Sequence, residues 1–166
     1  CNLLEVVVHT ADIQDGDGAK LVLEKLKILA RSLLVDFGIR NPHIAVLGLN
    51  PHAGESGHLG QEEIEVISPV INELAEAGMD LRGPLPADTA FNPDQLEQTD
   101  GFLAMYHDQG QIAMKLMGFD HGVTVHAGLA YPVTTSAHGS AYDIAGQGIA
   151  NVRALREAFL LACSMS

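Results

Sequence analysis

The stretch HIAVLGLNPHAGE, residues 43–55, begins as a continuous apolar run and ends as a polar loop. The run His43–Leu49 predicts a strand, because it is apolar throughout and of strand length. After the loop, which extends to Gly60, Glu62 and Glu63 open an amphipathic segment that reaches Gly78. Acidic residues in a first turn stabilise a helix through its dipole, and a kink is expected at Pro69. A strand, a loop and a helix in this order are typical of α/β proteins.

The same pattern recurs on both sides of this stretch. The segment Asp80–Asp88 predicts a short strand followed by irregular backbone, because Pro84 and Pro86 cannot donate ladder hydrogen bonds. Further strands are predicted at Leu4–Val8, Gly101–Tyr106 and Val123–Val125, and further helices at Leu21–Phe37, Gln109–Met117 and Val152–Cys163. This alternation predicts an α/β fold with a mostly parallel sheet flanked by helices.

Composition narrows the classes of function. A chain of 166 residues has the length of one domain with a sizeable core. Its 9 basic and 21 acidic residues give a net charge of -12, which argues against nucleic acid and anionic membranes as partners. No apolar run approaches the ~20 residues of a membrane-spanning helix. The two cysteines, Cys1 and Cys163, lie far apart, which fits a reducing cytoplasm.

Three histidines follow predicted strands: His9, His52 and His107. In open α/β sheets, ligands bind outside the carboxyl ends of the strands, so these three segments are expected to converge there. Imidazole is a common ligand of Zn²⁺ and similar ions. The alternative is that each histidine is a hydrogen-bonded residue in a polar loop. A metal would also reverse the negative field that an anionic substrate meets.

The run HGSAYDIAGQGIAN, residues 138–151, is rich in glycine and small side chains. Such a segment lets the backbone approach a flat or charged ligand closely. It is therefore a candidate ligand-binding loop.

This run and two further segments, residues 49–55 and 104–110, resemble the 4-hydroxythreonine-4-phosphate dehydrogenase family. The run 138–151 is also similar to the adenosine-binding loop of the isopropylmalate and isocitrate dehydrogenases. The resemblance covers nearly the whole chain but only about half of such an enzyme. It implies that residues 1–166 are the C-terminal portion of a two-domain, isopropylmalate-dehydrogenase-like protein whose N-terminal half is absent. This portion would contain the segments that bind the metal, the substrate and NAD.

The resemblance also implies an activity. Members of the family are dehydrogenases that act on a CH–OH group with NAD and a divalent metal such as Zn²⁺, Mg²⁺, Co²⁺ or Mn²⁺. They oxidise a small, anionic 4-phosphorylated hydroxy acid, which then loses carbon dioxide. They work as cytoplasmic homodimers that share the active site between subunits.

The resemblance assigns roles to individual residues. The metal ligands would be His9, His52 and His107. Asp88 and Lys115 would be catalytic, although Asp88 could equally stabilise a turn and Lys115 could be a solvent-facing side chain. The substrate would contact Lys115, Thr124 and Val133, and NAD would contact His138, Gly139, Ser140, Ala141, Asp143, Ile144 and Ala145.

Two of these positions depart from the family pattern. Thr124 and Val133 stand where biosynthetic members carry a substrate-binding Asn and Arg. Loss of an arginine that grips an anion favours a catabolic paralogue, acting on threonate 4-phosphate, erythronate 4-phosphate or a dihydrodiol dicarboxylate. A rival from another class is a non-catalytic nucleotide-binding module with structural histidines. A third possibility is a folded but inactive fragment.

Overall fold

The computed structural model describes residues 4–7 and 16–165. The chain forms two compact units, Cys1–Gln111 and Ile112–Ser166, rather than the single domain that its length suggests. The first unit holds a four-stranded sheet and the second a two-stranded sheet. The described large buried side chains lie in the first unit, whereas the buried residues after residue 112 are Ala154 and Ala158.

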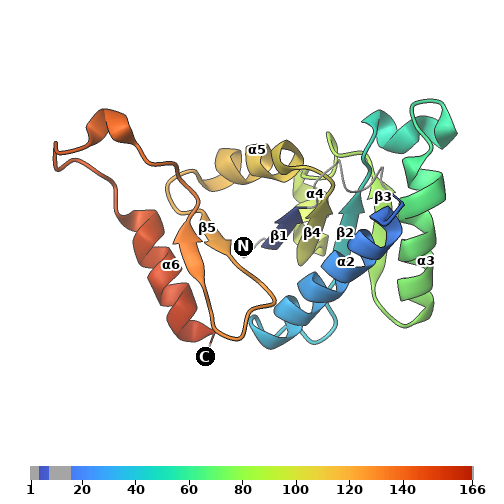
Figure 1. The fold of residues 1–166 in the computed structure, drawn as a ribbon, viewed down its shortest axis with the longest axis horizontal. Coiled ribbons are helices and arrows are strands. Elements are labelled where there is room, and N and C mark those ends of the chain that lie inside the picture. The colour runs from blue at the N-terminus through green and yellow to red at the C-terminus, as the bar shows by residue number, and fades with distance from the viewer. Residues whose placement is uncertain (1–3, 8–15, 166) are drawn as a thin grey trace. The chain divides into compact units, whose positions relative to one another are not determined.

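The strands of the first unit are all parallel. The sheet has the order β1 (Leu4–Val7), β4 (Gly101–Ala104), β2 (Ile44–Leu47) and β3 (Leu81–Leu85), as Figure 1 shows. In register, β4 pairs with β1 on one side and with β2 on the other. The predicted α/β fold with a mostly parallel sheet is therefore confirmed.

Helices α2 (Gly18–Val35) and α3 (Ser68–Glu76) supply the larger core of this unit. Their apolar stripes pack with alternate strand residues, including Val46 and Leu103, because side chains alternate between the two faces of a strand. The buried members of this core are Val22, Leu26, Leu29, Leu33, Ile44, Val46, Leu49, Ile67, Val70, Ile71, Leu74, Leu103 and Met105.

The remaining strand side chains form a second cluster, with Phe102 stacked on Phe91 at a centroid distance of 4.8 Å. Helix α4 (Pro93–Gln98), which the sequence analysis missed, packs here through Leu96. The sequence does contain a start signal for this helix, because Asn92 precedes its first residue and asparagine is a preferred N-cap. In the structure, the Asn92 side chain accepts a hydrogen bond from the Gln95 N–H at 3.1 Å. With apolar residues on both faces, the sheet has the composition typical of parallel sheets.

Strand β3 forms despite its proline. It pairs with β2, but the register shifts between Ala45 and Leu47, which is the irregularity expected from Pro84. Gly83 has a φ of +148°, and a Cβ at this position would collide with the Val46 carbonyl oxygen. A glycine is therefore needed for the close approach of β3 to β2.

The helix after the residue 50–60 loop begins as a π-helix, Glu63–Ile67, and continues as α3 from Ser68. The Ser68 N–H donates to the Glu63 carbonyl, five residues earlier. Pro69 lies in the first turn of α3, where its missing N–H is tolerated. The expected kink is therefore a change of helix type that places Pro69 at a helix start.

The second unit contains most of α5 (His107–Gly118), the antiparallel pair β5 (Val123–Val125) and β6 (Thr134–Ser136), and α6 (Arg153–Ser164). The predicted β5 exists, but it lies outside the parallel sheet, and β6 was not predicted. The Thr134 hydroxyl donates to the Ala158 carbonyl oxygen at 2.8 Å and so ties β6 to α6. A short helical turn, Tyr142–Ile144, interrupts the loop before α6.

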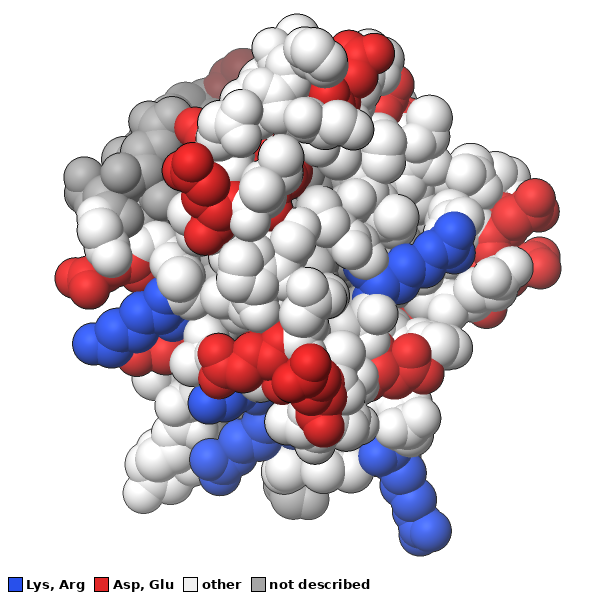
Figure 2. Space-filling model, turned by 90° about the vertical axis from the view of Figure 1, so that its right-hand side faces the viewer, with Lys and Arg blue, Asp and Glu red and all other residues white. Residues whose placement is uncertain are grey.

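Among the residues that the structure describes, no helix is long and apolar enough to cross a membrane. Figure 2 shows acidic side chains over the upper part of the visible face, where no basic ones are seen. The excess of acidic over basic residues in the sequence is therefore visible on this part of the surface.

Candidate active site

The expected site residues follow the carboxyl ends of the parallel strands. His52 comes after β2, Asp88 after β3, and His107 after β4 at the start of α5 (His107–Gly118). Since these strands are parallel neighbours, the three loops emerge at one edge of the sheet. His9, which follows β1, lies outside the described residues. Within residues 4–7 and 16–165, no group of three or more His, Cys, Asp or Glu side chains is arranged as a complete metal site.

This edge carries negative charge. The loops after β2, β3 and β4, residues 50–62, 86–92 and 105–110, contain no lysine or arginine. Their acidic residues are Glu55, Glu62, Asp88 and Asp108. The same loops contain three imidazoles, those of His52, His58 and His107. Carboxylates and imidazoles are ligand types that divalent cations accept, and a negative local field attracts positive charge.

The loop after β2 has a left-handed backbone. Five consecutive residues from His52 to Ser56 have φ between 44° and 78°. Four of them are not glycine, and for such residues this conformation costs roughly 1–2 kcal/mol each. Backbone strain of this kind persists only where surrounding contacts fix it, and it is concentrated at functional sites. The sequence analysis expected only a polar loop here, because no local pattern predicts this conformation.

Glu63 supplies such contacts. Its side chain is 3% exposed, and its carboxylate accepts hydrogen bonds from the Asn50 backbone N–H at 2.8 Å and from Asn50 Nδ2 at 3.0 Å. A Cβ added at Gly54 would lie 2.6 Å from Glu63 Oε2, so the turn packs directly on this carboxylate. Glu63 thus holds both the entry and the middle of the turn that carries His52.

Gln109 joins the loops that carry the two histidines. Its Nε2 donates to the Gly48 carbonyl oxygen at 2.7 Å, and its Oε1 accepts from the Met105 N–H at 2.8 Å. Gly48 precedes the His52 turn and Met105 precedes His107. One side chain therefore sets the spacing of the two segments.

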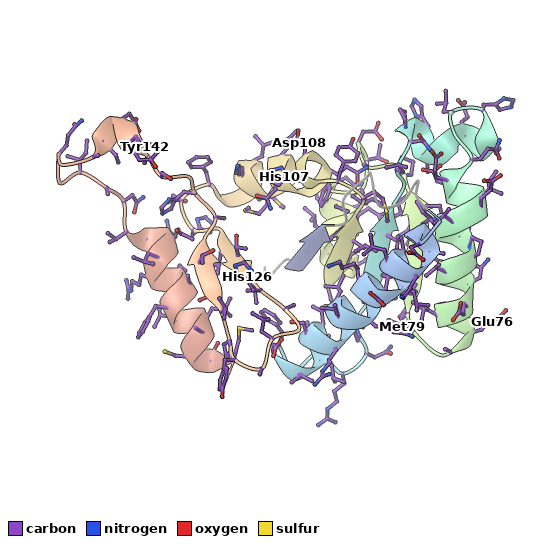
Figure 3. All side chains as sticks on the ribbon, in the orientation of Figure 1. Glu76, Met79, His107, Asp108, His126 and Tyr142 are labelled. Carbon is purple, nitrogen blue, oxygen red and sulfur yellow. The ribbon has the colours of Figure 1, made fainter. Side chains whose placement is uncertain are left out.

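His107 is oriented by its neighbour. Its Nδ1 lies 2.8 Å from Asp108 Oδ1, and Figure 3 shows both residues on the first turn of α5. When Nδ1 donates this hydrogen bond, Nε2 carries the lone pair that a metal requires. Both side chains are open to solvent, at 64% and 71% exposure, and so are accessible to a ligand.

Asp88 lies on an exposed turn after β3. The N–H and the hydroxyl of Thr89 both donate hydrogen bonds to the Pro86 carbonyl oxygen across this turn, each at 3.3 Å. The turn is thus closed without a contribution from the Asp88 side chain in the described structure. This leaves the Asp88 carboxylate for a role at the edge of the sheet.

In the second unit, the β5–β6 pair brings two expected substrate residues together. Thr124 pairs with Thr135, and the His126 N–H donates to the Val133 carbonyl at 2.9 Å, which extends the same register. Because side chains alternate along a strand, Thr124, His126, Val133 and Thr135 share one face, and all four are exposed. His126 was not among the expected site residues, and only the register reveals that it shares this face.

Lys115 is exposed on α5, eight residues after His107 on the same helix. It falls within the last turn, where a cation is favoured by the helix dipole. Both the expected substrate role and the solvent-facing alternative are compatible with this position.

The glycine-rich segment is an exposed loop with one helical turn, as the sequence predicts, and its role towards NAD stays a prediction. Ala141, Gly146 and Gly148 have positive φ, and a Cβ at Gly139 would meet no atom within 4 Å. His138 Nδ1 lies 2.9 Å from the Gly139 carbonyl oxygen. The open backbone fits a flat ligand, because no side chain of the described structure covers Gly139.

A small charged cluster joins α5 to α6. The Asp120 carboxylate accepts from His121 Nδ1 at 2.7 Å and from Arg153 at 3.0 Å. The hydrogen bond from His121 lowers the pKa of Asp120, and the charge of Arg153 acts in the same direction. The cluster links the residues after α5 to Arg153, the first residue of α6.

The chain is similar to known proteins over most of its length. The family model described as pyridoxal phosphate biosynthetic protein PdxA matches residues 10–162. A 4-hydroxythreonine-4-phosphate dehydrogenase of Salmonella arizonae is 50% identical over 153 residues, which are 92% of this chain and 46% of that protein.

Two solved structures extend the comparison. The 4-hydroxythreonine-4-phosphate dehydrogenase of Klebsiella pneumoniae matches with a TM-score of 0.77 and 35% identity, over 98% of this chain and 49% of that one. A terephthalate 1,2-cis-dihydrodiol dehydrogenase of Burkholderia xenovorans matches with a TM-score of 0.69 and 31% identity, over 98% and 52% of the two chains. The chain thus spans about half the length of the relatives that it matches.

Proposed function

This chain belongs to the PdxA family of pyridoxal phosphate biosynthetic proteins, and from that premise we propose that the protein is a dehydrogenase dependent on NAD and a divalent metal. Its substrate is a small 4-phosphorylated hydroxy acid of the 4-hydroxythreonine 4-phosphate type. The secondary hydroxyl is oxidised and the product then loses carbon dioxide. The described residues act as the C-terminal portion of this enzyme, with its metal, substrate and NAD segments.

The observation that carries this proposal is the edge of the sheet at which His52, His107 and Asp88 emerge from neighbouring parallel strands. His52 and His107 are the described candidates to hold the metal, and His9 is the third. A bound divalent cation supplies positive charge that stabilises the alkoxide during oxidation and the enolate after decarboxylation. Asp108 fixes the tautomer of His107, and Gln109 holds the two loops at a constant spacing.

Other residues of this chain bind and orient the reactants. Lys115 binds a substrate carboxylate or returns a proton to the product carbon, and Asp88 orients the hydroxyl. The loop from His138 to Ala145 binds NAD, which accepts the hydride, through open backbone around Gly139. A negatively charged edge without lysine or arginine also requires a cation before an anionic substrate can bind.

A second candidate substrate class is favoured by the exposed face of the β5–β6 pair. Thr124 and Val133 share this face, and neither side chain is a cation. A biosynthetic substrate would therefore lack the bidentate hydrogen bonds that an arginine makes to an anionic group. The catabolic alternative acts on threonate 4-phosphate, erythronate 4-phosphate or a dihydrodiol dicarboxylate, and the similarity to a dihydrodiol dehydrogenase supports it. Val133→Arg in the full-length protein should then raise kcat/KM for 4-hydroxythreonine 4-phosphate relative to the catabolic substrates.

The test is NADH formation by the full-length protein with these candidate substrates and each divalent metal. His52→Ala and His107→Ala should abolish activity together with stoichiometric metal binding. His43→Ala is the matched control, because His43 precedes β2 at the opposite edge and pairs with Asp80 at 2.8 Å. Nucleotide binding without hydride transfer to any of the candidate substrates would instead support the non-catalytic binding module.

The proposed enzyme is a cytoplasmic homodimer with the metal and substrate near the interface. A second subunit that covers loops of a small domain adds rigidity and excludes water. Sedimentation at assay concentration tests this arrangement, since a catalytically active monomer would rule out a shared site.

A further inference from the structure

We propose that Glu63 is a positioning residue that sets the geometry of His52 as a metal ligand. The starting observation is the left-handed turn from His52 to Ser56, which four non-glycine residues adopt against their own preference. A turn of this kind needs an external contact to stay in one conformation. The inference deepens the proposed function, because it concerns the loop that presents one of its metal ligands.

The contacts of Glu63 meet that need. One carboxylate oxygen accepts from the Asn50 backbone N–H, and the other accepts from Asn50 Nδ2. Gly54 in the centre of the turn packs on the second oxygen, and Gly48 before the turn packs on the first. The carboxylate therefore touches the backbone on both sides of His52.

Glu63 is itself held firmly. It is 3% exposed and starts the helical segment whose next turn places Ile67, at 0% exposure, in the main core. A carboxylate in a first turn is also favoured by the helix dipole. The turn that carries His52 is thus attached through one side chain to the helical segment that enters the main core of the first unit.

The chemistry requires a carboxylate at this position. Both of its oxygens face N–H donors of Asn50, so an amide would turn a donor towards one of them. Residues that orient metal ligands typically change metal affinity by about 10–100-fold when they are altered. Glu63→Gln should therefore weaken metal binding while the charge of nearby exposed acids is unchanged.

The experiment uses the full-length protein and Co²⁺ alone, followed through its visible absorption spectrum. Glu63→Gln should weaken Co²⁺ binding about tenfold or more and change the ligand-field bands. Asn50→Ala, which keeps the backbone hydrogen bond and loses the Nδ2 donor, should give a smaller effect. Glu65→Gln is the matched control, an exposed acid on the same helix, and should bind Co²⁺ as the unaltered protein does. Unchanged affinity and spectrum in both Glu63→Gln and Asn50→Ala would overturn the proposal.

A metal-free readout separates this proposal from the proposed function. In the NMR spectrum of the apoprotein, the ring signals of His52 should shift in Glu63→Gln and stay in place in Glu65→Gln, while those of His43 serve as an internal reference. If the unaltered protein binds no Co²⁺, the metal role in the proposed function fails, and the NMR comparison alone decides the role of Glu63. Identical His52 signals in Glu63→Gln would then overturn it.

Discussion

The side-chain amide of Gln109 donates a hydrogen bond of 2.7 Å to the carbonyl oxygen of Gly48, 61 residues earlier in the chain. The same amide accepts from the Met105 N–H, so one residue closes a bridge between the ends of β2 and β4. The two proposed metal ligands of the described chain, His52 and His107, lie on the loops that this bridge joins.

Replacement of Gln109 by Ala should destabilise the protein. The change leaves the Gly48 carbonyl and the Met105 N–H without their partner, and an unsatisfied group in a part-buried site costs roughly 1–3 kcal/mol. We expect the free energy of unfolding, measured with urea, to fall by about 2–3 kcal/mol. Gln98→Ala, at the exposed end of α4, is the control, and an equal loss in both variants would contradict the bridge.

Asp108→Asn should weaken metal binding without loss of the fold. The neutral amide lowers the basicity of the His107 ring and no longer fixes one tautomer, so affinity should drop by about tenfold. Calorimetric titration of the full-length protein with Zn²⁺ measures the change. Asp94→Asn, in the first turn of α4, removes the same charge elsewhere and should leave the affinity unaltered.

Gly139→Trp should weaken NAD binding selectively. A Cβ at Gly139 meets no atom within 4 Å, so we expect the fold to accept a side chain there, whereas an indole would occupy the proposed cofactor site. We expect the Kd for NAD to rise roughly tenfold or more, which is a loss of about 1.4 kcal/mol, with no change in Tm. Gly16→Trp, also in open space, is the control, and unaltered NAD affinity in Gly139→Trp would remove the loop from the cofactor site.

The Asp120 cluster should make stability depend on pH in the acid range. The pKa of the Asp120 carboxyl is lowered in the folded state by the hydrogen bond from His121 and by the charge of Arg153. The stabilisation is therefore fully present above the usual carboxyl pKa and is lost as pH falls through the lower folded value.

Urea unfolding at a series of acidic pH values tests this sign. The stability difference between the unaltered protein and Asp120→Asn should vanish at the lowest pH. Arg153→Gln should shift that loss towards higher pH, because one of the influences that lower the pKa of Asp120 is removed. A difference that persists unchanged at the lowest pH would refute the assignment.

Much of the fold could be predicted from local patterns. The strand at Ile44–Leu47 and the long helix Gly18–Val35 were anticipated within a few residues of their ends, because buried strands and amphipathic helices have distinct periodicities. The predicted strand Val123–Val125 was correct, but its assignment to a largely parallel sheet was not, since its partner β6 is antiparallel and too short to be recognised.

The sequence by itself determined the α/β class, the acidic surface and the placement of His52 and His107 after strands, since each depends on composition or on neighbours along the chain. The tertiary structure decided the order of the strands, the left-handed turn at His52, its attachment to buried Glu63 and the bridge from Gln109 to Gly48. These features arise from contacts between distant segments. Hydrogen bonds and close packing of that kind leave no periodic trace in the sequence, because they depend on how the chain returns to itself in space.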